Sequence, residues 1–159
     1  MTDEGFPFQL PPDHDDAEEA GVFFQSEDIE FSLQDADVIT NWINAIISRE
    51  GCRLSSLNIV CCSDEYLHQI NLNYLQHDTL TDIITFPYAD PPDIQGDILI
   101  SIDRIEDNAA DLGISFSDEL HRVIIHGVLH LCGYGDKTPA EKKVMTEKED
   151  EALALFPAS

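Results

Sequence analysis

Apolar residues follow two different spacings along the chain, and each spacing predicts one kind of element. Helical spacing predicts helices over residues 36–50, 64–75, 102–113, 115–133 and 138–156. Apolar alternation or short runs rich in β-branched residues predict strands over residues 22–33, 55–62, 81–87 and 96–102. Because strands and helices are mixed along the chain, we expect an α+β fold with a small mixed β-sheet.

Several helix boundaries carry recognisable end signals. Ser63 can cap the second helix, and either Ser115 or Ser117 can cap the fourth. The last helix opens with Thr138-Pro139-Ala140-Glu141, which has the form of a capping box with proline at the first helical position. Glycines stand where three helices should end: Gly51, Gly113 and Gly133.

The helix over residues 115–133 is apolar almost all round from Val123 to Cys132, apart from two histidines. A helix of this kind is typical of the centre of a domain, so we expect the other helices to pack around it. Trp42 has helical spacing with its apolar neighbours in the helix over residues 36–50 and is expected in the core.

His126 and His130 are four residues apart, so on a helix their side chains lie about 40° apart and stack on one face. His121 points roughly 140° away from His126, and we expect it to lie apart from the pair. Past Gly133 the chain can fold back and bring Asp136, or a neighbour of it, within reach of the same ion. Two histidines and a carboxylate leave one position of a tetrahedral zinc open for water, as catalytic sites do.

The alternative is that His126 and His130 are buried histidines bonded to the backbone or to solvent. In an otherwise apolar helix each would be a desolvated polar group without an evident partner, which is costly. The pair therefore favours a metal site. A metalloprotease helix of the HExxH type carries a glutamate after the first histidine, whereas this chain has Gly127 there. This argues against peptide hydrolysis and leaves a metal that activates water and polarises a phosphodiester oxygen.

The net charge of −24 is the unusual global property of the chain. Residues 1–20 hold seven acidic residues and no Lys or Arg, and are expected to be a disordered acidic extension before a single domain over residues 21–159. Most of the acidity therefore belongs to the folded domain, whose surface should repel a polyanion. In molar salt the screening length falls to roughly 3 Å, so we hypothesise that the surface is adapted to a salty cytoplasm.

The remaining composition suggests a soluble cytoplasmic protein with reduced thiols. No window approaches the 18 or so apolar residues of a membrane span, and the first residues lack the basic start and apolar run of a secretory signal. Cys61 and Cys62 are adjacent in a predicted strand, so their side chains should point to opposite faces rather than form part of a disulfide framework.

The segment HGVLHLCGYGDK, residues 126–137, resembles the HGxLHLxGYDH signature of the YbeY-type bacterial endoribonucleases, which mature ribosomal RNA. A second family segment, roughly NxxYR…D…TDVLSFP followed by GDI, is matched by residues 71–75, Asp78, residues 81–87 and residues 96–98. The order and spacing agree over about residues 22–156. The resemblance maps the three zinc ligands of the family, at H-x3-H-x5-H, onto His126, His130 and Asp136.

This resemblance implies a single-strand-specific, zinc-dependent endoribonuclease in ribosomal RNA maturation and ribosome quality control. It also implies one Zn²⁺ per chain, with RNA and ribosomal subunits as partners and no membrane. Nickel or manganese stay open as alternatives to zinc. Two other functions also stay open: a non-catalytic ribosome-assembly factor with a structural metal, and a zinc hydrolase of another phosphoester. The sequence assigns neither the general base nor the oligomeric state.

The chain departs from the family pattern at two positions. Asp136 stands where the family has its third histidine, and aspartate can bind zinc through oxygen. Leu75 stands where the family has an arginine expected to bind phosphate, for which Lys137 or Arg104 are candidate substitutes.

Three further polar residues allow two readings each. Asp82 can orient a ligand histidine or stabilise the entry to a strand. Tyr134 can line a substrate cleft or pack under the turn after the histidine helix, which is the expected role. His77 is expected to be a solvated loop residue.

Overall fold

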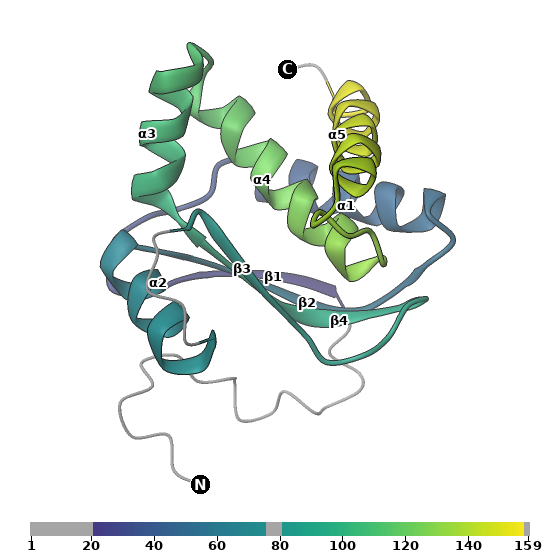
Figure 1. The fold of residues 1–159 in the computed structure, drawn as a ribbon, viewed down its shortest axis with the longest axis horizontal. Coiled ribbons are helices and arrows are strands. Elements are labelled where there is room, and N and C mark those ends of the chain that lie inside the picture. Colours follow the sequence, from purple (N-terminus) through teal and green to yellow (C-terminus); the bar gives the residue numbers. More distant parts are fainter. Residues whose placement is uncertain (1–20, 76–80, 158–159) are drawn as a thin grey trace, which may run out of the picture.

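The computed structural model describes residues 21–75 and 81–157. The elements in chain order are β1 (Gly21–Ser26), α1 (Ala36–Arg49), β2 (Arg53–Cys62), α2 (Asp64–Ile70), a π-helical turn (Asn71–Leu75), β3 (Ile83–Pro87), β4 (Asp93–Ser101), α3 (Ile102–Leu112), α4 (Phe116–Leu131) and α5 (Pro139–Ala154) (Figure 1). The expected α+β fold class is confirmed.

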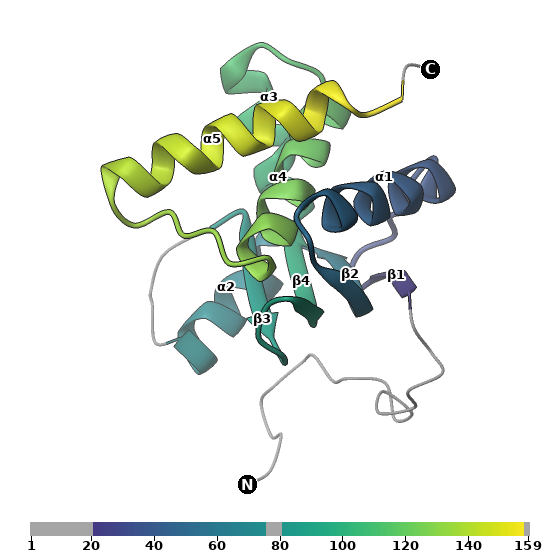
Figure 2. The same ribbon diagram turned by 90° about the vertical axis from the view of Figure 1, so that its right-hand side faces the viewer.

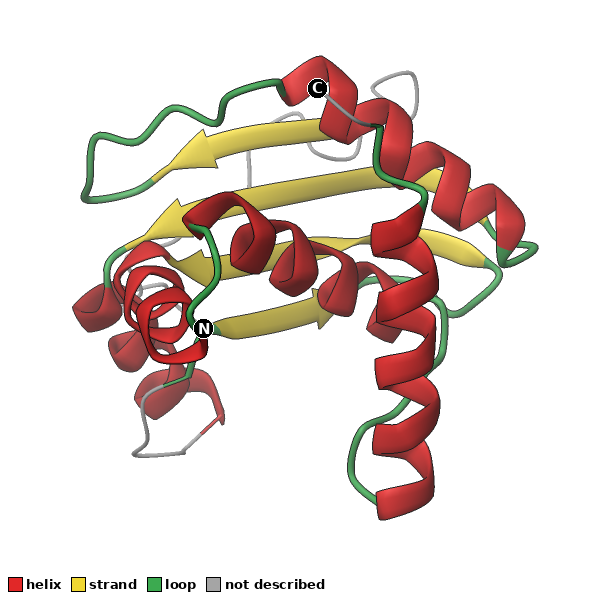
Figure 3. Ribbon diagram, turned by 90° about the horizontal axis from the view of Figure 1, so that it is seen from above, coloured by secondary structure: helices red, strands yellow, loops and turns green. Residues whose placement is uncertain are grey.

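The strands form one four-stranded mixed sheet in the order β1-β2-β4-β3. β1, β2 and β4 are parallel, and β3 pairs antiparallel with β4 at the edge. The last six residues of both β2 and β4 are buried, as expected of central parallel strands covered on both faces (Figure 3).

Helices cover the two faces of the sheet unequally. The larger core cluster joins one face of the sheet to α1, α3, α4 and α5, whereas the smaller cluster joins the opposite face to α2 (Figures 1 and 2). Cys61 belongs to the larger cluster and Cys62 to the smaller one, so the prediction that their side chains face opposite ways is confirmed. All four cysteines are free.

Helix α4 lies directly on the sheet, and α5 crosses over its outer side (Figure 2). A Cβ atom added at Gly127 would stand 2.9 Å from Cδ1 of Ile83 and 3.0 Å from Cδ1 of Ile98. Glycine at this position therefore lets the helix backbone approach the sheet, which explains why no glutamate follows the first histidine. Trp42 is buried as expected, and its indole N–H donates to the carbonyl oxygen of Ala152 at 2.8 Å.

Most helix boundaries agree with their end signals. Ser63 and Ser115 cap α2 and α4, and the capping box of Thr138 and Glu141 is present at α5. Gly113 follows α3 in the left-handed region, with φ of 70°.

Two strand boundaries lie three or more residues from their expected positions, and one expected helix changes type along its length. The strand expected over residues 22–33 ends at Ser26, because Asp28 adopts a positive φ of 52° and its carboxylate accepts from the backbone and hydroxyl of Ser63. The helix expected over residues 64–75 spans that range, but it becomes π-helical after Ile70. The strand expected from residue 96 already begins at Asp93, where its pairing with β2 starts.

Some expectations concern residues outside the described ranges: the acidic extension over residues 1–20, Asp78 and the role of His77. Within the described ranges, no helix has the length and apolar character that crossing a membrane would require.

Candidate metal centre

The last two turns of α4 place His126 and His130 side by side. The helix starts at the Ser115 cap and continues to Cys132, so the four-residue spacing keeps both imidazoles on one face. Their ring centroids are 4.8 Å apart, with the ring planes nearly perpendicular. Both side chains are partly exposed, His126 by 21% and His130 by 29%, so an ion can reach them from solvent.

A tight reversal after α4 returns the chain to these histidines. Gly133 has a φ of 114°, and the N–H groups of Gly133 and Tyr134 donate to carbonyl oxygens in the last turn of α4. Glu141 then accepts from the backbone N–H groups of Lys137 and Thr138 at 2.9 and 3.1 Å, and these bonds lower its pKa. Asp136 is thus held between a glycine turn and the capped start of α5.

The turn brings one carboxylate oxygen of Asp136 to both histidines. Its Oδ2 lies 3.3 Å from Nε2 of His126 and 3.4 Å from Nε2 of His130. Two ligand atoms bound at about 2.1 Å to a tetrahedral zinc ion are themselves roughly 3.4 Å apart, so these separations suit a shared ion. The three side chains form a group whose ligand atoms all lie within 4.8 Å of one another.

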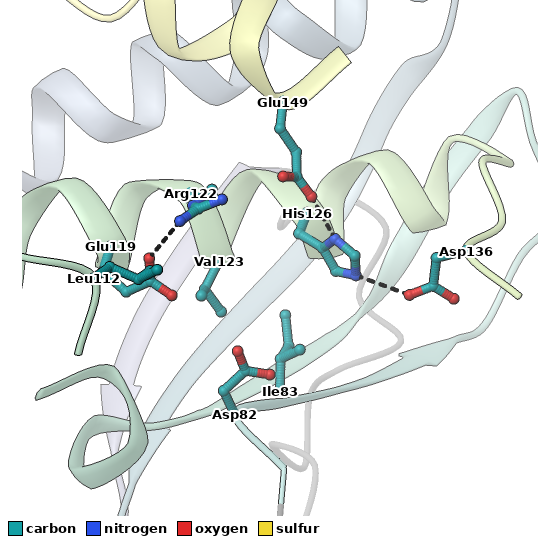
Figure 4. A pocket seen from close by; sticks show the side chains of 9 residues that line it. All are labelled: Asp82, Ile83, Leu112, Glu119, Arg122, Val123, His126, Asp136 and Glu149. Carbon is teal, nitrogen blue, oxygen red and sulfur yellow. Dashed lines mark hydrogen bonds and ion pairs between the residues drawn. The ribbon is translucent and has the colours of Figure 1, made fainter. Parts of the chain in front are cut away.

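Glu149 on α5 forms a hydrogen bond with His126 at the ring nitrogen that does not face Asp136. The Nδ1–H of His126 donates to Oε2 of Glu149 at 2.6 Å, and the Glu149 side chain is only 9% exposed (Figure 4). In the neutral form of His126 this bond favours the tautomer whose Nε2 lone pair is available to an ion shared with Asp136.

The surroundings of His126 raise its pKa above the ordinary histidine value. Burial is the largest single influence and lowers the pKa, but the hydrogen bond and charge of Glu149 raise it, as do the charges of Asp136 and Asp82. A divalent cation would satisfy the same carboxylates, so the acidic surroundings favour an ion at this position.

A pocket of about 480 Å³ opens beside His126, and its lining includes four acidic residues and one cation (Figure 4). The acidic residues are Asp82, Glu119, Asp136 and Glu149, and the cation is Arg122. Burial raises the pKa of both Asp82 and Glu119. Arg122 donates to Glu119 at 3.1 Å, and this ion pair opposes the effect of burial on Glu119.

Sequence reasoning did not identify Glu149, Glu119 or Arg122. One signal for Glu149 was available: it occupies the buried stripe of α5 between Met145 and Ala152, where an acid needs a partner. Asp82 lines the pocket, but within the described ranges it makes no hydrogen bond to His126 or His130. The orienting bond considered for Asp82 is made by Glu149 instead, and the backbone of Asp82 accepts from Ser101 at the entry to β3.

The other residues considered from sequence lie away from the pocket. His121 stacks on Phe156 at 4.1 Å, which agrees with its expected separation from the pair. Tyr134 donates to Glu50 at 2.6 Å, consistent with packing beneath the turn. Arg104 pairs with Asp64 and Asp107. Neither Leu75, which is 40% exposed, nor Lys137 lines the pocket.

The arrangement is an exposed acidic pocket with a preformed group of two nitrogen ligands and one oxygen ligand at its edge. Three ligands of this kind leave a coordination position open on a tetrahedral metal, as in catalytic rather than structural zinc sites. The pocket therefore suits metal-assisted hydrolysis of a substrate that enters from solvent.

Comparisons with known proteins agree on one family. The family model described as Endoribonuclease YbeY matches residues 21–156. The chain is 50% identical to the protein named Endoribonuclease YbeY of Flavobacterium johnsoniae, over 80% of this chain and 91% of that protein. The protein of the same name from Amoebophilus asiaticus is 52% identical, over 82% of this chain and 89% of that protein.

The fold also resembles a solved structure. The solution structure of a Thermotoga maritima protein superposes with a TM-score of 0.60 at 25% identity, over 83% of this chain and 86% of that one.

Proposed function

The chain belongs to the YbeY endoribonuclease family, and on that premise we propose that it is a metal-dependent endoribonuclease that cleaves single-stranded RNA. Its work in the cell is the maturation of ribosomal RNA and ribosome quality control, in the cytoplasm and on ribosomal subunits. The observation that carries this proposal is the group formed by His126, His130 and Asp136 at the edge of an open pocket, because hydrolysis of an RNA phosphodiester needs an electrophile close to the phosphate.

The cofactor in this proposal is one Zn²⁺ per chain, held by Nε2 of His126, Nε2 of His130 and a carboxylate oxygen of Asp136. When bound, such an ion makes water a nucleophile near neutral pH and polarises a phosphoryl oxygen. Nitrogen and carboxylate ligands at tetrahedral spacing favour zinc over magnesium or calcium, which prefer all-oxygen surroundings.

The protein residues then have distinct parts in the reaction. Glu149 holds the ring of His126 and keeps its Nε2 unprotonated toward the ion. The fold-back at Gly133 and the Glu141 capping bonds hold Asp136 in place. The position next to His126 is Gly127, which packs on the sheet, so no side chain from that position acts as a base.

A cleavage assay with matched variants tests the proposal. Ribosomal precursor RNA is incubated with zinc-loaded wild type, His130→Ala and the control His68→Ala, at low and high KCl, and bound metal is measured by elemental analysis. We expect the wild type and the control to bind about one zinc per chain and to cleave, and His130→Ala to lose both properties.

Equal cleavage by wild type and His130→Ala would refute the enzyme proposal. A wild type that binds zinc but is inactive at every salt concentration would favour the assembly factor, and activity on small phosphoesters alone would favour the other hydrolase.

A further inference from the structure

A second pocket of about 600 Å³ adjoins the metal-site pocket. Its walls come from the turn before α4, from α4 itself and from the C-terminal part of α5. Its apolar and aromatic lining is Ile114, His121, Leu153 and Phe156, and two carboxylates, Asp118 and Asp150, stand beside these.

Arg122 lines both pockets and therefore stands where they meet. It precedes His126 by four residues, so the two side chains lie on the same face of α4, about one helical turn apart. The chain has eight Lys and Arg residues, and the other seven line neither pocket. On a protein with a net charge of −24, Arg122 is the cation placed to meet a polyanion that enters the metal site.

The setting of Arg122 leaves donors available for a ligand. Its side chain is 34% exposed, and one of its terminal nitrogens donates to the buried Glu119 at 3.1 Å. A guanidinium has five N–H groups in a planar fork, so most of them can still reach an oxyanion. Glu119 thus holds the guanidinium group of Arg122 in place without using all of its N–H donors. The planar arrangement of these donors suits bidentate binding of phosphate.

We propose that Arg122 binds a phosphate of the RNA strand adjoining the one at the metal site, and that the second pocket receives the nucleobase next to that phosphate. This inference rests on the proposed endoribonuclease function and adds a nucleotide subsite to it.

Spacing and chemistry both support a nucleotide at this place. Four residues of helix rise about 6 Å, comparable to the rise of one to two stacked nucleotides at about 3.4 Å each. The pocket beyond Arg122 is lined by the stacked rings of His121 and Phe156 and by aliphatic side chains, against which a base can pack, as in single-strand sites. Asp118 and Asp150 can accept hydrogen bonds from base N–H groups, but they would repel a phosphate. The phosphate is therefore assigned to Arg122 and the base to the second pocket.

Steady-state kinetics of the zinc-loaded protein on a single-stranded RNA oligonucleotide test the phosphate contact. For Arg122→Gln we expect KM to rise by about tenfold or more, kcat to stay within about threefold, and the slope of log KM against log KCl to fall by about 0.7, since one phosphate contact is lost. Arg122→Lys should recover part of the KM, because it keeps the charge but not the fork. Arg53→Gln, which alters an exposed ion pair elsewhere, is the matched control and should behave as wild type.

A change in the substrate tests the base contact without altering the fold. Removing the base from successive nucleotides beside the cleaved bond should raise the wild-type KM by about fivefold or more at one position. Ile114→Ala should reduce this effect, whereas Val144→Ala, also an exposed apolar residue but outside both pockets, should not.

An unchanged KM and salt slope in Arg122→Gln would overturn the phosphate assignment, and indifference to every missing base would overturn the base assignment. In either case wild-type cleavage leaves the proposed function standing. A wild type that cleaves no RNA would refute the proposed function and this inference together.

Discussion

Replacing Glu149 by glutamine tests how strongly the hydrogen bond from His126 to Glu149 affects metal binding. Glutamine has nearly the same shape but no charge, so it weakens the 2.6 Å bond to Nδ1 of His126 without opening a cavity. It can also turn its amide N–H toward the ring and favour the wrong tautomer, with the proton on Nε2.

The expected magnitude follows from the burial of the pair. The side chain of Glu149 is 9% exposed and that of His126 is 21% exposed, so solvent screens their interaction only partly. Losing such a partner behind a metal ligand typically lowers metal affinity by about 10–100-fold, or about 1.4–2.7 kcal/mol at about 1.36 kcal/mol per tenfold change. We expect Glu149→Gln to bind Zn²⁺ about 10–100-fold more weakly than wild type.

The assay is competition for Zn²⁺ between the protein and a chromophoric chelator of known affinity, at pH 7.5. Glu147→Gln is the matched control, because Glu147 lies on the same helix but is exposed. A Glu149→Gln variant that folds normally and binds zinc as tightly as the control would refute the view that Glu149 orients His126.

Three further predictions concern packing, charge and pH. Gly127→Ala should lower the free energy of unfolding in a urea titration, because overpacking against Ile83 and Ile98 costs about 1–3 kcal/mol and exceeds the gain in helix propensity of about 1 kcal/mol or less. The melting temperature should rise from dilute buffer to molar KCl, since screening relieves repulsion at a net charge of −24; equal melting in both would contradict the salt hypothesis. In chelator-treated protein, protonation of His126 stabilises the fold because the folded state raises its pKa. The stability of wild type relative to Glu149→Gln should therefore be greatest below about pH 6.5 and fall as the pH rises through the raised pKa. Urea midpoints of the two proteins that differ by the same amount at every pH would exclude this linkage.

Local patterns in the sequence predicted the parts of the molecule that depend on neighbouring residues. The spacing of His126 and His130 is a property of one helix, and Gly133 gave a reason for the chain to return near that helix, so Asp136 was a reasonable third member of the group. The structure brings the three together, while their binding of zinc stays a prediction.

The supporting residues could not be located in the same way, because they depend on how α5 crosses α4. Glu149 is 23 residues beyond His126, and only the packed position of α5 brings its carboxylate to Nδ1. Nothing in the local sequence around Arg122 indicated a role, and only the fold places this residue between two pockets. The first strand was predicted too long for a related reason: Asp28 ends it through a hydrogen bond from Ser63, which is 35 residues away.

The central claim is that a metal held by His126, His130 and Asp136 is needed to cleave RNA. The most direct test strips the purified protein with a chelator, measures cleavage of a single-stranded ribosomal precursor RNA, and then adds one equivalent of Zn²⁺. We predict that cleavage disappears on stripping and returns with zinc in wild type but not in His126→Ala. Undiminished cleavage by metal-free protein would contradict the account.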